Sequence, residues 1–241
     1  MNKRQNLWYR GMAHLVARPF LPLFLNVKCV GEENIPEKGA ALIVCNHRSW
    51  TDPIITAIEI TRPINFLAAS FNFFIPVVGW VFKNAGVIPL YPEGGKRNEP
   101  SLRKCIRLLK KGELVGVYPE GMQNFLFPEG EKIKRFHTGF VRIALATGVK
   151  VIPMAIIAEK EVIGGKLVDA VMKPFMQTQV PKGVDMSVFK IIAYQGKVTL
   201  RVGKPISLEE YYHHMHTKDL LNTIAGRVRR EVIELYKMGL L

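Results

Sequence analysis

The segment NHRSWTDP carries the pattern most suggestive of chemistry, because His47 precedes Asp52 by five residues. It continues from an apolar run, residues 40–46, that predicts a strand buried on both faces. Open α/β sheets place ligands and catalytic groups just beyond such strand ends. Pro53 predicts that a helix begins here with Asp52 as its N-cap, so that the carboxylate turns back towards the imidazole. We therefore predict that His47 is a general base and that Asp52 orients it and stabilises its protonated form.

The spacing of this pair does not identify a site by itself, since His214 and Asp219 repeat it. That second pair lies in a polar, helical part of the chain with no strand before it, and we interpret it as a solvent-exposed helix face. Two nucleophiles near His47 are also unpromising. Cys45 belongs to the predicted buried strand, and Ser49 has no nucleophile-elbow setting, so we predict neither as a covalent catalyst.

Polar residues also follow two other predicted strands. The apolar run at residues 113–118 ends in the turn PEG, which presents the carboxylate of Glu120 at the same sheet edge as His47. The run at residues 86–91 is followed by basic residues, for which a solvated surface charge is the alternative interpretation. The candidate anion ligands are Lys96, Arg97, Lys134 and Arg135.

Composition indicates an anionic partner. The chain of 241 residues has 34 Lys and Arg against 20 Asp and Glu, a formal charge of +14. Nucleic acid, anionic lipid or an acidic carrier protein would each fit that charge. No helix-turn-helix, zinc-finger or RNA-binding signature occurs, and 48% hydrophobic residues favour lipid. The three scattered cysteines form no disulfide framework or metal motif, so we expect no metal and a reducing compartment.

The rest of the chain predicts strands and helices around a largely parallel sheet. Further strands are expected at residues 149–156 and 197–203, and helices at 101–111 and 136–147. Ser207 and Glu210 form a possible capping box that opens a C-terminal helix. The uncharged stretch at residues 64–82 is interrupted by polar residues, glycine and proline, so we interpret it as buried or partly embedded in a membrane rather than spanning one.

We divide the chain into an N-terminal helical segment, residues 1–28, and an α/β domain, residues 29–241. Residues 5–25 mix aromatic and aliphatic residues with arginine, which is typical of an amphipathic helix lying in a membrane interface. The alternative is a helix packed on the core. Prolines and charged residues interrupt the apolar run that a signal peptide needs, so we do not expect secretion.

Residues 30–156 resemble the glycerolipid acyltransferases typified by 1-acylglycerol-3-phosphate acyltransferase. Four blocks occur in the order of that family: Asn46 with His47 and Asp52, then GVIPLY, then YPEG at 118–121, then VIPM at 151–154. RVGKPI gives a weaker fifth match. The ordered set is far more specific than any one block.

The resemblance implies an α/β fold with N-terminal helices that dock on a bilayer. It implies that His47 deprotonates an acceptor hydroxyl, which attacks an acyl-CoA or acyl-carrier-protein thioester without a covalent enzyme intermediate or a cofactor. It further implies that Asn46, Glu120 and Gly121 bind the acceptor and that Pro153 forms an apolar wall beside it. We accordingly expect a peripheral or monotopic enzyme at the cytoplasmic face of a membrane, acting on 1-acylglycerol-3-phosphate among anionic lipids and not on nucleic acid.

Three acceptor-side positions depart from the family pattern. Gln123 stands where an arginine is usual, Pro92 follows Tyr91 where Asp-Arg is usual, and Ala69 replaces a lysine. The four candidate anion ligands supply the missing charge, or the acceptor is a different lipid, such as a glycolipid or an aminoacyl lipid. A non-catalytic lipid-binding protein with the same fold is the third interpretation.

Overall fold

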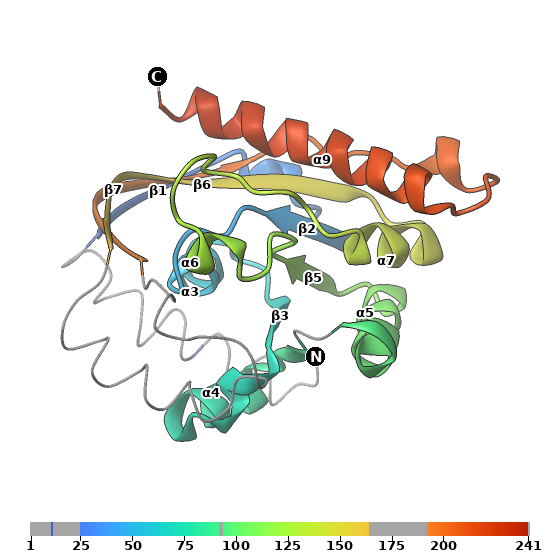
Figure 1. The fold of residues 1–241 in the computed structure, drawn as a ribbon, viewed down its shortest axis with the longest axis horizontal. Helices are drawn as coiled ribbons and strands as arrows, with labels where there is room; N and C mark the ends of the chain where they lie inside the picture. The colour runs from blue at the N-terminus through green and yellow to red at the C-terminus, as the bar shows by residue number, and fades with distance from the viewer. Residues whose placement is uncertain (1–10, 12–24, 92–93, 164–191, 241) are drawn as a thin grey trace.

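The computed structural model describes residues 11, 25–91, 94–163 and 192–240, and within them seven strands form one mixed sheet (Figure 1). The strand order is β1-β7-β6-β2-β5-β3-β4. All neighbouring strands run parallel except β6 and β7, which are antiparallel. The strands are β1 (Leu25–Val30), β2 (Ala41–Cys45), β3 (Ile64–Ala69), β4 (Ile88–Leu90), β5 (Leu114–Val117), β6 (Val151–Ile163) and β7 (Ile192–Val202). The predicted α/β architecture with a largely parallel sheet is confirmed.

Helices cover both faces of this sheet. The α-helices are α3 (Asp52–Glu59), α4 (Pro76–Ala85), α5 (Glu99–Lys110), α6 (Gln123–Leu126), α7 (Gly139–Thr147) and α9 (Lys218–Met238). The 3₁₀ helices are η3 (Glu32–Asn34), η4 (Ser70–Phe74), η5 (Gly95–Asn98) and η7 (Glu209–Tyr211). Figure 1 shows α9 running along the sheet beside β6, from α7 towards the C-terminus.

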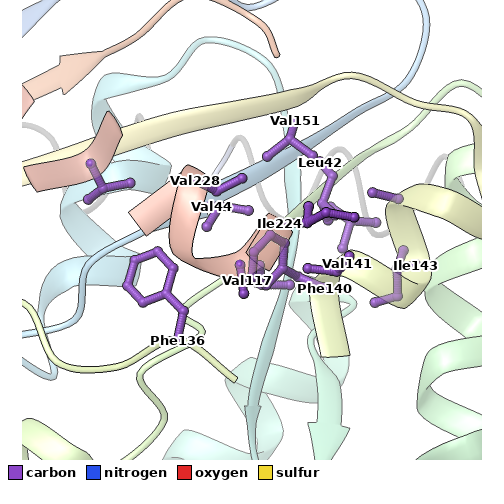
Figure 2. Packing of buried hydrophobic residues seen from close by; sticks show 14 of the residues in the cluster. Leu42, Val44, Val117, Phe136, Phe140, Val141, Ile143, Val151, Ile224 and Val228 are labelled. Carbon is purple, nitrogen blue, oxygen red and sulfur yellow. The ribbon is translucent and has the colours of Figure 1, made fainter. Parts of the chain in front are cut away.

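The core consists of two apolar clusters separated by the sheet. In β2, Leu42 and Val44 belong to the cluster beneath α5, α7 and α9, which Figure 2 shows from close by. Ala41, Ile43 and Cys45 belong to the other cluster, which α3 helps to cover. Successive side chains of a strand point to opposite faces, and a cluster covers each face of β2, so all of its residues are buried. This explains why the strand before His47 appears in the sequence as an unbroken apolar run.

The predicted strands and helices are mostly confirmed. The expected helices correspond to α5 and α7, and the expected strands to β2, β4, β5, β6 and β7. Pro89 lies in β4 at the sheet edge, where a missing N–H donor is tolerated. Residues 64–82 form β3, η4 and the start of α4. No helix among the described residues is long and apolar enough to cross a bilayer.

Two predicted boundaries are wrong. The helical segment assigned to residues 1–28 extends too far, because residues 25–28 pair with β7 as part of β1; residues 1–10 and 12–24 lie outside the described residues. The capping box does not open the C-terminal helix. Ser207 Oγ accepts a hydrogen bond from Glu209 N before the short helix η7, at 3.3 Å. Helix α9 begins later, where Thr217 Oγ1 accepts from Leu220 N at 3.2 Å.

Candidate active site

The structure brings His47 and Asp52 together just beyond the end of β2. His47 Nδ1 lies 2.9 Å from Asp52 Oδ2. An ionised carboxylate only accepts hydrogen bonds, so Nδ1 donates to it, and in a neutral imidazole Nε2 is then the nitrogen that accepts a proton. Asp52 is completely buried, whereas 17% of the His47 side chain is exposed. The imidazole therefore has one nitrogen fixed by the protein and one available to a substrate.

Asp52 reaches the histidine by a different local geometry from the one predicted. Thr51 is the N-cap of α3, and Asp52 is the first helical residue. Its carboxylate turns back over the preceding turn, where Oδ2 accepts hydrogen bonds from the backbone N–H groups of Arg48 and Ser49, both at 2.8 Å. The expected N-cap role of Asp52 is wrong, but the expected fold-back towards His47 is confirmed.

Aromatic rings enclose the imidazole. The ring of Tyr118 stacks on His47 with centroids 4.5 Å apart, and Phe125 meets it edge-on at 4.9 Å. Phe66 stacks in turn on Tyr118 at 5.8 Å. These contacts restrict rotation of the histidine ring and surround it with apolar surface.

Glu120 and Asn124 hold the backbone of His47. Glu120 Oε1 accepts from His47 N at 2.7 Å, and Asn124 Nδ2 donates both to His47 O, at 2.8 Å, and to Glu120 Oε2, at 2.6 Å. Glu120 Oε2 also accepts from Lys134 N. Burial raises the pKa of Glu120 to about 7, against the opposing effect of these donors. These contacts join the turn after β2 to α6 and to the loop that contains Lys134.

Arg48 occupies a buried ionic cluster that the sequence did not suggest. Its guanidinium bonds Glu161 through Nε at 3.1 Å and through Nη2 at 2.6 Å. Nη1 donates to Asn124 Oδ1 at 2.9 Å and to Pro128 O at 3.2 Å. Lys132 Nζ also contacts Glu161, at 2.8 Å. Although burial opposes it, these hydrogen bonds hold the pKa of Glu161 below its ordinary value.

Three residues predicted at the acceptor site face into the protein. Asn46 is buried and pairs with the backbone of β6, donating to Ile156 O at 3.1 Å and accepting from Ile156 N at 2.8 Å. Glu120 is equally buried and uses its oxygens on protein donors. Pro153 shares the face of β6 whose neighbours Val151 and Ala155 pack in the cluster with α9. Asn46 and Glu120 thus bond protein groups, and Pro153 lies on the α9 side of the sheet, which does not fit the acceptor contacts predicted for these three residues.

A separate cleft of about 640 Å³ lies beside Pro153 on the α9 side of the sheet. Its lining includes Lys204, Arg227 and Leu235. Met154 and Ile156, on the other face of β6, belong to the cluster against which Tyr118 packs, and Tyr118 stacks on His47. The cleft is therefore separate from the space around His47.

The predicted basic ligands do not form one cluster. Lys96 and Arg97 are exposed in η5, where Arg97 lies over the ring of Tyr91. Lys134 Nζ donates to Glu129 O. Arg135 is exposed and donates to Asn222 Oδ1 in α9, at 3.3 Å. Three of the four side chains thus have separate partners, and their role as anion ligands stays a prediction.

Gln123 uses its side-chain amide within the protein. Its Nε2 donates to Glu120 O at 2.9 Å and to Arg135 O at 2.8 Å, which ties the turn after β5 to the following loop. Gly121 in the same turn has φ +60°, a conformation that favours glycine. A side-chain Cβ there would approach the ring of His137 at 3.8 Å.

The two rejected nucleophiles remain unpromising in the structure. Burial raises the pKa of the Cys45 thiol well above its ordinary value, with Asp52 and Glu120 contributing in the same direction. Ser49 Oγ donates to Ile192 O at 2.6 Å, so its proton is engaged with β7. Within the described ranges, no group of three or more His, Cys, Asp and Glu side chains is arranged to hold a metal ion.

Comparison with known proteins places these features in context. Residues 26–157 match the family model described as Acyltransferase. The chain is 28% identical over 159 residues to the chloroplastic 1-acyl-sn-glycerol-3-phosphate acyltransferase LPAT1 of Arabidopsis thaliana, covering 64% of this chain and 43% of that protein. It is 29% identical over 132 residues to the 1-acyl-sn-glycerol-3-phosphate acyltransferase of Borreliella burgdorferi, covering 55% of this chain and 51% of that protein. The chain thus spans about half or less of these curated relatives.

A solved structure is similar over a longer range. The crystal structure of the 1-acyl-sn-glycerophosphate (LPA) acyltransferase PlsC from Thermotoga maritima aligns with a TM-score of 0.61 and 26% sequence identity. The alignment covers 98% of this chain and 83% of that one.

Proposed function

This chain belongs to the acyltransferase family, and from that premise we propose that it transfers a fatty acyl group from a thioester to the free hydroxyl of 1-acylglycerol-3-phosphate. The donor is acyl-CoA or acyl-carrier protein. The observation that carries the proposal is the 2.9 Å contact between His47 Nδ1 and Asp52 Oδ2 at the end of a buried strand.

In the proposed reaction, His47 Nε2 takes the proton of the acceptor hydroxyl as its oxygen attacks the thioester carbonyl carbon. The tetrahedral intermediate collapses with cleavage of the carbon–sulfur bond, and the leaving thiolate takes the proton from the imidazolium. The products are an ester and a free thiol. Asp52 stabilises the imidazolium in between, and no enzyme nucleophile takes part. The Ser49 hydroxyl is engaged in a hydrogen bond and the Cys45 thiol is buried, and both observations support direct transfer.

Two acceptor lipids are candidates. The relatives named as 1-acyl-sn-glycerol-3-phosphate acyltransferases favour 1-acylglycerol-3-phosphate. The inward amide of Gln123, at the position where the family usually has arginine, favours a second candidate, an acceptor lipid without a phosphomonoester.

A panel of acceptors tests both candidates. Purified enzyme would be given a labelled acyl thioester with 1-acylglycerol-3-phosphate, a monoacylglycerol or a lysoglycolipid. The leading proposal expects the highest kcat/KM with 1-acylglycerol-3-phosphate. Preference for a phosphate-free lipid would support the second candidate, and no transfer to any acceptor would favour a non-catalytic lipid-binding protein.

We further propose that the enzyme works on the surface of a membrane with anionic lipids, at its cytoplasmic face. Large apolar side chains are exposed on α4 and on the 3₁₀ helix before it, namely Phe74, Val77 and Trp80. Val77 and Trp80 are three residues apart and so share one helix face. Trp50 and Ile54 are exposed beside the turn that carries His47. Such side chains suit insertion into the interfacial region of a bilayer.

Vesicle binding tests this surface. Trp80→Glu should weaken binding to vesicles that contain phosphatidylglycerol, because it places a negative charge at the lipid boundary. Met215→Glu is the matched control, since Met215 is also an exposed apolar residue but lies in the loop before α9. Equal binding by both variants would refute a docking surface at α4.

A further inference from the structure

The two oxygens of Asp52 have different partners. Oδ2 receives the contact from His47 Nδ1 and the backbone donors of Arg48 and Ser49. Oδ1 accepts a hydrogen bond from the hydroxyl of Tyr194, at 2.7 Å. Within the part of the chain that the structure describes, Tyr194 is the sole partner of Oδ1. The residue lies in β7, 142 positions from Asp52 and outside the residues that match the family model.

We propose that Tyr194 is a positioning residue for acyl transfer, holding Asp52 Oδ1 so that the ionised carboxylate keeps Oδ2 against His47. This inference rests on the proposed function. It extends the pair of His47 and Asp52 to a chain of three side chains, in which Tyr194 acts through the carboxylate without touching substrate.

The burial of Asp52 makes this hydrogen bond important. Asp52 has no solvent-exposed surface, so water does not replace a lost donor at Oδ1. A buried charged oxygen without a partner is disfavoured, so the carboxylate would turn towards other donors. Such a rotation would take Oδ2 away from His47 Nδ1. The Tyr194 hydroxyl therefore holds the Asp52 carboxylate in the orientation that the reaction needs.

Tyr194 is a firmly placed donor. Burial raises the pKa of its phenol, and the neighbouring Asp52 raises it further, so the hydroxyl keeps its proton. The residue pairs with Glu161 in the antiparallel β6–β7 ladder. A second hydrogen bond, from Ser49 Oγ to Ile192 O at 2.6 Å, joins the same strand to the turn after His47.

Charged and titratable groups face Tyr194 from several elements. Asp52 lies in α3, Cys45 in β2, Glu161 in β6 and Arg48 in the turn after β2. Glu161 is paired with Arg48, and burial keeps Cys45 a neutral thiol. Among these groups, Asp52 is the one that receives the hydrogen bond of the phenol.

The test is Tyr194→Phe, which removes the hydroxyl and keeps the ring. At neutral pH, kcat for acyl transfer should fall roughly tenfold, the factor expected from losing one hydrogen bond to a charged group. KM for both substrates should stay unchanged. A loss in kcat with unchanged KM distinguishes a positioning role from a role in binding substrate.

Tyr236→Phe is the matched control. Tyr236 is 8% exposed and Tyr194 is 7% exposed, but Tyr236 lies in α9 in the other core cluster. Its variant should keep wild-type kcat and KM. Urea unfolding verifies that each variant is folded in the assay. If Tyr194→Phe does not fold while Tyr236→Phe does, the hydroxyl is structural and the positioning role is refuted.

A double-mutant cycle with Asp52→Asn tests whether Tyr194 acts through the carboxylate. In the Asp52→Asn background, Tyr194→Phe should lower kcat by less than about twofold, because interacting residues are not additive. A full additional loss, a loss confined to KM, or wild-type kinetics of the single variant would overturn the proposal. Absence of transfer by the wild-type enzyme would instead refute the proposed function.

Discussion

Arg48→Met should destabilise the fold strongly, because Arg48 joins the turn after His47 to two other segments. The guanidinium side chain is 2% exposed and its partner Glu161 is 12% exposed. Methionine fills much of the same space without charge. The variant leaves Glu161 with Lys132 as its cation and removes the donors to Asn124 Oδ1 and Pro128 O.

The expected magnitude follows from these contacts. Breaking a buried ion pair on one side costs about 3–5 kcal/mol. Lys132 lies 2.8 Å from Glu161 and compensates part of the lost charge. We therefore expect Arg48→Met to lower the free energy of unfolding by about 3 kcal/mol. Adding Glu161→Leu removes the stranded carboxylate, so the double variant should be more stable than Arg48→Met alone.

Urea unfolding of Arg48→Met, of Glu161→Leu and of the double variant measures these differences. Arg103→Met is the matched control, because its ion pair with Glu99 lies on an exposed helix face and should contribute less than about 1 kcal/mol. Arg48→Met should also lower kcat, because Arg48 holds Asn124, which holds the carbonyl of His47. A loss no larger than that of Arg103→Met, or additive losses in the double variant, would refute the reasoning.

Three other outcomes follow from the site and the fold. Burial raises the pKa of Glu120 to about 7 from an ordinary value near 4.5, so the folded protein binds the extra proton between these pH values. The contribution of Glu120 to the free energy of unfolding should therefore fall as pH rises across that window. Glu120→Gln should make the free energy of unfolding depend less on pH. If urea unfolding between about pH 5 and pH 8 gives the same slope of this free energy against pH for both proteins, the prediction is contradicted. Cys45 should resist maleimide at neutral pH in the folded protein, because burial raises its pKa; rapid labelling detected by mass spectrometry would contradict its placement. Thr217→Ala should cost about 1 kcal/mol in urea unfolding by removing the N-cap of α9 while leaving transfer unchanged, and an unchanged unfolding midpoint would argue against that cap.

The sequence predicts those features that depend on neighbouring residues. The run at residues 40–46 is apolar at every position up to Cys45, because β2 is buried on both faces, and the turn after it carries both His47 and Asp52. Their geometry is set within one turn and the start of one helix. Strands β2, β4, β5, β6 and β7, helices α5 and α7, and this pair could therefore be predicted without a structure.

The sequence does not predict contacts made by tertiary packing. Arginine usually lies at the protein surface, yet Arg48 is buried and meets Glu161, 113 positions away in β6. Tyr194 reaches Asp52 only because β7 pairs with β6. The inward orientation of Asn46 and Glu120 similarly depends on partners in β6 and in the loop that contains Lys134. The candidate anion ligands are likewise close in sequence, but Arg97, Lys134 and Arg135 have separate partners in the structure.

The most direct test of the account is acyl transfer by His47→Ala, with His214→Ala as its matched control. His214 stands before Asp219 at the same spacing, but it is exposed in the loop before α9. Labelled acyl thioester and 1-acylglycerol-3-phosphate would be incubated with each folded variant, and the ester product quantified. We predict that His47→Ala lowers kcat by about 10²–10⁴-fold while His214→Ala retains wild-type kcat. Wild-type kcat in His47→Ala would contradict the assignment of His47 as the general base.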